Sequence, residues 1–370
     1  MFTALPFLNR YCLPVLLMIL TFLSHGGPAQ AQQDAKFMIS AANPLAAEAG
    51  RDMLARGGSA IDAAIATQMV LTLVEPQSSG IGGGAFLLYF DNETKQLETY
   101  DGRETAPAAI EETHFLKTDG SKKDFYEAVV GGGSVGVPGV IAMMAKAHKD
   151  HGILPWKDLF TPAITHATEG FLISPRLHYL LDRDKYLKTK STAAAYFYEA
   201  DGSAKAAGTR LKSPALAKTL MHIANEGPDA FYKGALAEDI VQTVRSDNGN
   251  PGVMSMTDMA NYKAVKREPV CAPYRAHKVC GMGPPTSGGI TLLQTLRILE
   301  NWDVPTLKPG SAKAIDLIAQ ASALAFADRE KYLADGDFID IPINDLLSPE
   351  YTKSRSNLIT LRESQLPFKP

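Results

Sequence analysis

Residues 75–90 read EPQSSGIGGGAFLLYF, a run of four glycines and two serines that leads into an apolar segment. Glycine-rich runs of this kind cradle phosphate, expose a nucleophile, or let two backbones pass closely. A phosphate-binding loop needs the order strand, glycine turn, helix, because the helix N-terminus supplies the free amides. The flanking residues predict the reverse order, with an alanine-rich helix before the glycines and a strand after them. Close passage of a helix and a buried strand is therefore the simplest interpretation of these residues taken alone.

The sequence around this run predicts a helix-rich chain with short strands. Asn43-Pro44 is typical of a helix start, and Gly57-Gly58 ends that helix. Ser59, with Asp62 three residues later, resembles a capping box and predicts a second helix. Further helices are expected over residues 140–150, 156–169, 213–245 and 311–332 and after 284–289, and strands over 85–90 and 97–100. The regular alternation that builds a doubly wound sheet is missing, so we expect an α+β fold.

Composition limits the classes of function. The chain has 370 residues, of which 45% are hydrophobic and 21% charged, so it can bury the core of one large domain or two smaller ones. Its 37 basic and 40 acidic residues give a net charge of −3, which provides no electrostatic footprint for nucleic acid or an anionic membrane. We therefore expect no nucleic-acid partner and favour small-molecule chemistry.

The N-terminus resembles a secretory leader. Arg10 precedes an apolar run over residues 12–23, and Pro28-Ala29-Gln30-Ala31 offers small residues for cleavage. An apolar run of about 12 residues falls short of the roughly 20 that span a bilayer, which favours a leader over a membrane anchor. We predict a signal peptide over residues 1–31, a periplasmic or secreted mature chain over residues 32–370, and no membrane span after leader cleavage.

Leader removal takes away Cys12 and leaves Cys271 and Cys280 in an oxidising compartment. Residues 267–281 read REPVCAPYRAHKVCG, which predicts a hairpin with a two-residue turn at Arg275-Ala276. In that register the cysteines face each other at a non-hydrogen-bonded pair, where Cα atoms approach most closely, and this geometry suits a disulfide. Arg-Ala is a poor choice for the positive φ angles of a type I′ turn, so two free thiols remain the alternative.

Two weak patterns point to a nucleotide or a metal. Gly131, Gly133 and Gly136 fit G-x-G-x-x-G before a helix, but no strand returns afterwards to complete a βαβ unit with an acidic ribose partner. The eight histidines include no H-E-x-x-H motif, and His148-x-x-His151 lacks a companion ligand nearby, so both are expected to be solvated polar residues. We expect no cofactor and no metal.

A third pattern suggests a serine hydrolase. Residues 132–136 fit the G-x-S-x-G of a nucleophile elbow around Ser134, with Asp239 and His277 downstream in the order serine, acid, histidine. Such an elbow requires a strained turn with a helix starting beside Ser134 and several parallel strands before it. The sequence pattern supports neither, so a serine hydrolase that uses Ser134 is the less favoured enzyme.

Arg103 is the candidate binding residue. It lies in DGRETAP, residues 101–107, where the second strand of the predicted hairpin ends. A guanidinium at this place can bind a carboxylate through two parallel hydrogen bonds. Its spacing alone favours a simpler role, as half of an exposed ion pair with Glu104.

Seven ordered motifs between residues 37 and 351 resemble the large-subunit region of the γ-glutamyltranspeptidases (glutathione hydrolases), which are N-terminal-nucleophile hydrolases. These motifs are NPLA (43–46), GGSAIDAA (57–64), EPQSSGIGGG (75–84), GVPG (136–139), GPDAFYKG (227–234), PPTSGG (284–289) and ADR (327–329). No single motif is specific to this family, but the occurrence of all seven in this order over most of the chain is specific.

The resemblance implies a four-layer αββα sandwich, of which this chain supplies the helix-rich large-subunit part with some strands of both sheets. It also implies that Arg103 binds the α-carboxylate of a γ-glutamyl group. In that family a threonine, freed by self-cleavage at the N-terminus of a small subunit, attacks the γ-amide of the substrate and forms an acyl-enzyme. The implied partners are that small subunit, glutathione and other γ-glutamyl compounds, and water or an amino acid or dipeptide as acceptor.

This sequence departs from the family pattern at three places. The expected junction, Thr-Thr-His followed by an aromatic residue and serine, is missing, and residues 361–370 read LRESQLPFKP. We therefore expect the nucleophilic threonine beyond Pro370, assign no catalytic residue within the chain, and expect this chain alone to be inactive. Thr286 stands where the family commonly has serine, and residues 334–337 read ADGD where GDPD is usual. The alternative is a non-catalytic glutamyl-binding remnant or an unstable fragment.

Overall fold

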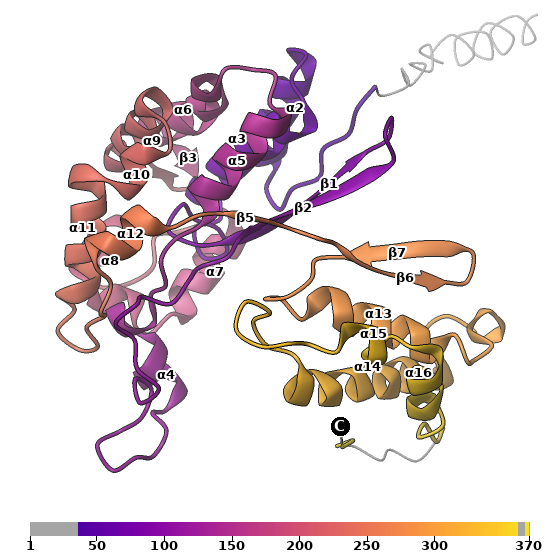
Figure 1. Ribbon diagram of the computed structural model, residues 1–370. Coiled ribbons are helices and arrows are strands. Elements are labelled where there is room, and N and C mark those ends of the chain that lie inside the picture. The colour runs from indigo at the N-terminus through magenta and orange to yellow at the C-terminus, as the bar shows by residue number, and fades with distance from the viewer. Residues whose placement is uncertain (1–35, 362–366, 370) are drawn as a thin grey trace, which may run out of the picture. The chain divides into compact units, whose positions relative to one another are not determined.

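A computed structural model describes residues 36–361 and 367–369 (Figure 1). The fold begins with two capped helices, α2 (Pro44–Ala55) and α3 (Ala60–Val74). The Asn43 side chain accepts the Leu45 amide at 3.1 Å, and Ser59 and Asp62 form a reciprocal capping box. Both predicted helix starts are confirmed. The two helices contact each other, and both bury small residues, among them Ala46, Ala49, Ala63 and Ala66, which permit close packing.

Residues 1–40 form one unit and residues 41–370 another. Of the first unit the structure describes residues 36–40, which contain no helix or strand. The predicted signal peptide over residues 1–31 lies outside the described residues. Among the helices that the structure does describe, none has both the length and the apolar character needed to cross a bilayer.

A three-stranded antiparallel sheet follows the glycine run, in the order β1 (Ala85–Asp91), β2 (Gln96–Gly102), β5 (Val265–Arg267). The predicted β1–β2 hairpin is confirmed, with Leu88 opposite Thr99. Strand β5 was not predicted, because the three residues Val-Lys-Arg carry no alternating apolar pattern. It joins the sheet by pairing Thr99 with Arg267. The fully buried Tyr100 lies on β2, which contacts helix α5 (Val140–His151).

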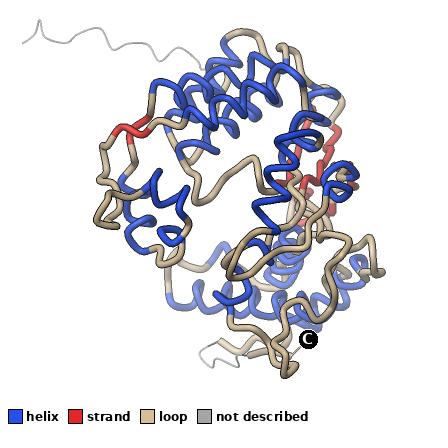
Figure 2. Tube along the Cα trace, turned by 90° about the vertical axis from the view of Figure 1, so that its left-hand side faces the viewer, coloured by secondary structure: helices blue, strands red, loops and turns tan. Residues whose placement is uncertain are grey.

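Most of the remaining chain to residue 261 is helical, and strands are confined to short segments (Figure 2). The helices are α4 (Phe125–Val129), α6 (Thr161–Glu169), α7 (Pro175–Arg183), α8 (Ser191–Phe197), α9 (Pro214–Glu226), α10 (Asp229–Tyr232), α11 (Gly234–Arg245) and α12 (Met256–Asn261), with 3₁₀ turns η1 (Gly132–Ser134), η2 (Trp156–Phe160) and η3 (Leu187–Thr189). Strands β3 (Phe171–Leu172) and β4 (Arg210–Leu211) form an antiparallel pair. Helix α3 lies in the centre of this part, where it contacts α2, α5, α6 and η2.

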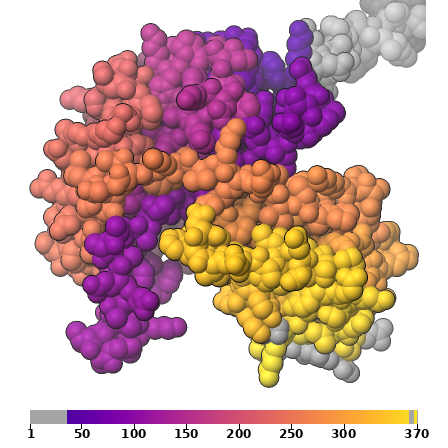
Figure 3. All heavy atoms as spheres, viewed as in Figure 1, coloured from indigo at the N-terminus to yellow at the C-terminus, as the bar shows by residue number. Residues whose placement is uncertain are grey.

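The C-terminal part consists of a hairpin on a group of helices. Strands β6 (Val270–Tyr274) and β7 (His277–Gly281) both contact α13 (Gly288–Leu299), as Figure 1 shows. Further elements are η4 (Val304–Thr306), α14 (Ala312–Tyr332), α15 (Ile343–Leu346) and α16 (Pro349–Ser356). A buried apolar cluster joins α13 and α14 to the C-terminal residues: Ile298, Leu299, Leu317, Ala321, Leu324 and Ile359. The orange and yellow atoms of this part accordingly form one continuous mass (Figure 3).

Helices with small separate sheets make this an α+β fold, which confirms the predicted class.

The glycine run brings backbones together, but its partners differ from those predicted. The Gly83 carbonyl accepts the amides of Gly139 (2.9 Å) and Val140 (3.1 Å) at the start of α5. A Cβ atom on Gly84 would lie 2.5 Å from a carboxylate oxygen and 2.8 Å from the backbone nitrogen of Glu104. The backbone amides at the N-terminus of α5 therefore donate to the Gly83 carbonyl within the protein. Gly84 has no side chain, which leaves room for the segment that contains Glu104.

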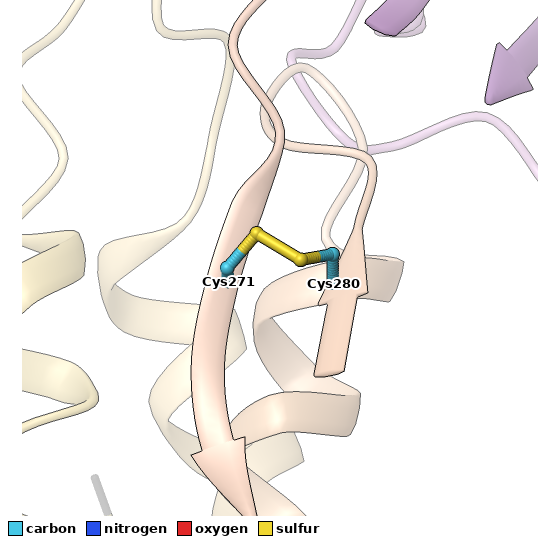
Figure 4. The surroundings of a disulfide bond; sticks show 2 residues. All are labelled: Cys271 and Cys280. Carbon is cyan, nitrogen blue, oxygen red and sulfur yellow. A yellow bond between two sulfur atoms is a disulfide. The ribbon is translucent and has the colours of Figure 1, made fainter. Parts of the chain in front are cut away.

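The cysteine hairpin has the predicted register. Cys271 lies opposite Cys280 and Tyr274 opposite His277. Arg275, the first residue of the turn, has a φ of 53°, so it adopts the left-handed conformation that its side chain disfavours. The structure joins the two cysteines, whose Cα atoms are 4.1 Å apart, by a disulfide (Figure 4).

Replacement of Gly84 by alanine should lower the free energy of unfolding by about 1–3 kcal/mol, because the added methyl group meets the Glu104 backbone. Gly82→Ala is the matched control, since a Cβ atom there meets nothing within 4 Å. Its effect should stay within about 0.5 kcal/mol. Urea unfolding of both variants measures the difference, and equal stabilities would contradict the steric argument.

The intact mass of the purified chain should increase by about two mass units on reduction, because opening one disulfide adds two hydrogens. A Cys271→Ser/Cys280→Ser variant is the control and should show no increase. If the unaltered chain also shows none after purification without reductant, the two cysteines are free thiols.

Candidate functional site

A cavity of about 650 Å³ lies where the C-terminal end of β2 meets three distant segments of the chain. Its lining comes from within residues 101–106, 262–267, 285–287 and 329–338. The fold thus brings together three motifs that are far apart in the sequence: DGRETAP, PPTSGG and ADR. The volume suits a small molecule rather than a macromolecule.

Arg103 enters this cavity from a backbone that is fixed on both sides. Its amide donates to Asp101 Oδ1 at 2.8 Å, and its carbonyl accepts from the Tyr262 hydroxyl at 2.7 Å. Burial raises the pKa of Tyr262, so that hydroxyl keeps its proton and remains a donor. The Tyr262 ring stacks on Tyr232 with centroids 5.7 Å apart, which holds the donor in place.

The guanidinium of Arg103, in contrast, is free. Within residues 36–361 and 367–369 it has no hydrogen-bond or ion-pair partner, and it lies over the face of the Phe86 ring, whose centroid is 6.0 Å from the Arg103 Cζ atom. The ion pair with Glu104 that the spacing alone favoured is not formed. A fixed backbone with an unpaired, planar cation can bind an incoming carboxylate through two hydrogen bonds.

Arg267 is a second arginine at this cavity, and it was not among the predicted site residues. Its Nε atom donates to Asp101 Oδ2 at 2.7 Å, and its two terminal nitrogens donate to the two oxygens of Asp337 at 2.7 and 2.6 Å. These hydrogen bonds lower the pKa of the Asp337 carboxyl. No local signal identifies Arg267, because its partners lie 166 and 70 residues away along the chain.

The structure does not form the nucleophile elbow. Ser134 ends the 3₁₀ turn η1, and its hydroxyl donates to the Val129 carbonyl at 2.7 Å. The segment before it is helix α4, where an elbow requires a strand. Asp239 lies in α11 and His277 on β7, and among the described residues no hydrogen bond joins either of them to Ser134.

Both histidines at the end of α5 differ from the prediction of solvated side chains. His148 Nε2 lies 2.8 Å from the Leu154 carbonyl, and His151 Nε2 lies 2.7 Å from a Glu98 oxygen. Two carboxylates, Glu98 and Asp150, lie beside His151. The sequence does not reveal this grouping, because Glu98 reaches His151 only through the contact between β2 and α5.

A lysine already supplies the positive charge between these two carboxylates. Lys266 Nζ lies 3.0 Å from Glu98 and 2.9 Å from Asp150. Hydrogen bonds from His151 and Lys266 lower the pKa of Glu98 to about 2. The cluster of Glu98, Asp150, His151 and Lys266 is thus a paired network that ties β5 and β2 to α5.

Comparisons with known proteins agree with the motifs. The family model described as Gamma-glutamyltranspeptidase matches residues 46–369. The glutathione hydrolase proenzyme of Bacillus subtilis (strain 168) is 38% identical over 324 residues, which cover 88% of this chain and 54% of that protein. The glutathione hydrolase proenzyme of Escherichia coli (strain K12) is 35% identical over 340 residues, which cover 91% of this chain and 57% of that protein. The chain thus spans about half the length of these relatives.

A solved structure shows the same fold. The crystal structure of Helicobacter pylori γ-glutamyltranspeptidase superposes with a TM-score of 0.85 at 32% identity, over 90% of this chain and 94% of that one. The family match, the relatives and the fold lead to one conclusion. This chain belongs to the γ-glutamyltranspeptidase family of N-terminal-nucleophile hydrolases.

Proposed function

We propose that this chain is the large-subunit region of an exported enzyme that cleaves the γ-glutamyl amide of glutathione and passes the glutamyl group to water or an amino acid. The observation that carries the proposal is the free guanidinium of Arg103, held at a small-molecule cavity in a chain of this family. A mature start after residue 31 and a periplasmic or secreted location are part of the proposal.

In the proposed reaction Arg103 orients the substrate. Its two parallel N–H donors bind the α-carboxylate of the γ-glutamyl group, which fixes the direction of the γ-carbonyl. A threonine hydroxyl from the small subunit attacks that carbonyl, and the amine of the remaining peptide leaves as the ester forms. Water or the amine of an amino acid then takes the glutamyl group from the ester. This chain contributes substrate binding and scaffold, and the nucleophile belongs to its partner.

Exposed apolar side chains on the edge strand β1 favour the presence of a partner subunit. Its alternating residues Phe86, Leu88 and Phe90 share one face of the sheet, and the side chains of Leu88 and Phe90 are 45% and 56% exposed. Strand β1 is also an edge of its sheet. An apolar edge strand of this kind is normally covered by another segment. The word proenzyme in the names of the relatives agrees with a precursor that is processed into two subunits.

A chain without that partner is the competing hypothesis, in which a glutamyl-binding remnant has no activity. The two hypotheses differ in the coding sequence after Pro370. An in-frame segment that encodes Thr-Thr-His and a small subunit supports the enzyme, and a stop codon supports the remnant. The purified 370-residue chain should release no glutamate from glutathione by itself, and glutamate release would contradict the proposed division between the subunits.

Replacement of Arg103 by alanine in the complete protein should lower kcat/KM for glutathione by about 30-fold or more, because a charge-assisted pair to a bound carboxylate is worth about 2–5 kcal/mol. Arg103→Lys keeps the charge but loses the bidentate geometry, so it should fall between the alanine variant and the unaltered protein. The release of glutamate measures both.

Arg51→Ala is the control, since Arg51 pairs with Asp52 on the exposed surface of α2 and should leave kcat/KM unchanged. An Arg103→Ala variant with unaltered kcat/KM would remove Arg103 from the binding site.

A further inference from the structure

The cavity presents an electrostatic problem for a carboxylate ligand. Its lining includes four basic side chains and five carboxylates, so its formal charge is negative. Two of the carboxylates flank Arg103 in the sequence, namely Asp101 and Glu104, and Asp337 lines the same cavity. A carboxylate of the protein that pairs with Arg103 competes directly with a carboxylate of the substrate.

Arg267 binds two of these carboxylates. Its single guanidinium binds Asp101 through Nε and Asp337 through both terminal nitrogens, and all three N···O distances lie between 2.6 and 2.7 Å. The side chains of Arg267 and Asp101 are only 18% and 7% exposed, so water screens this pair less than an ion pair on the open surface.

The same contact acts on the backbone of Arg103. Asp101 Oδ2 accepts from Arg267 while Asp101 Oδ1 accepts from the Arg103 amide, so one carboxylate connects the two arginines. Asp337 belongs to the segment between α14 and α15, and its amide is bound in turn by the Asp335 carboxylate at 2.9 Å. Arg267 therefore also holds this wall of the cavity against the sheet.

We propose that Arg267 is a positioning residue for γ-glutamyl recognition: it saturates Asp101 and Asp337 so that the Arg103 guanidinium stays free for the substrate carboxylate. The inference rests on the proposed function, in which Arg103 binds that carboxylate. Arg267 itself does not touch the substrate in this arrangement. Its effect is to remove intramolecular competitors and to orient the carboxylate that fixes the Arg103 amide.

The test compares Arg267→Met with the same substitution combined with Asp337→Asn, in the complete protein with its small subunit. Arg267→Met should raise KM for glutathione about threefold to tenfold with little change in kcat, because the released carboxylates compete for Arg103 before the substrate binds. Adding Asp337→Asn removes one released competitor and should restore at least half of the loss in KM. Arg51→Met, which removes an arginine from a surface pair, is the matched control and should not change KM.

A purely structural salt bridge gives the opposite result. If Arg267 only attaches the 333–338 segment, neutralising Asp337 cannot repair the Arg267→Met variant, and KM stays high or rises further. That result, or an unchanged KM in Arg267→Met, overturns the proposal.

A single variant covers the case in which Arg267→Met does not fold. Asp337→Asn alone removes a carboxylate from the cavity and leaves Arg267 bound to Asp101, so KM should stay the same or fall. A rise in KM overturns the proposal.

The Arg103→Ala variant separates this inference from the proposed function. If Arg103→Ala loses activity and Arg267→Met keeps its KM, only the role of Arg267 is wrong. If Arg103→Ala keeps its kcat/KM, Arg103 does not bind the substrate carboxylate and this inference fails with that assignment, whereas a complete protein that releases no glutamate from glutathione overturns the proposed function.

Discussion

The close contact between the glycine run and two other segments determines the site. The Gly83 carbonyl accepts the first amides of α5, and Gly84 lets the Glu104 backbone pass at a distance that a side chain would block. These contacts fix where β1 begins, where α5 starts and where the chain goes after β2. Arg103 directly precedes Glu104, so its position depends on the close approach of the Glu104 backbone to Gly84, which only a residue without a side chain permits. The glycines act through packing, and the cation next to them is the residue proposed to bind the substrate carboxylate.

Local signals predicted much of the fold. The caps at Asn43 and Ser59, the β1–β2 hairpin and the register of the cysteine hairpin follow from short-range rules, in which partners lie within a few residues of each other. Strand β5 was missed because three residues without apolar alternation become a strand only by pairing with β2. Helix α4 was not predicted either, because its five residues are too few to show a helical apolar period.

The candidate site was predictable to a lesser degree. Arg103 was identified from its place in a motif and from the family resemblance, whereas its spacing alone favoured a surface ion pair. The residues that position it come from the far end of the sheet: Tyr262 and Arg267 reach it only because residues 262–267 return to β2. His151 and Lys266 meet Glu98 for the same reason. Contacts set by tertiary pairing leave no characteristic spacing in the sequence, so no local pattern indicates them.

The crosslink in the β6–β7 hairpin has a limited thermodynamic role and a specific geometric one. Only nine positions separate the cysteines, so the bond closes a small ring and restricts the unfolded chain by about 2–3 kcal/mol. A shift of the two strands by one residue would turn the two sulfur atoms to opposite faces, and the bond forbids that shift. Because the turn places Arg275 in a left-handed conformation that its side chain disfavours, local preference alone specifies this alignment weakly. The disulfide instead fixes the register of the β6–β7 hairpin, which packs against α13. Because both cysteines lie within this hairpin, the bond needs no contact with distant parts of the chain.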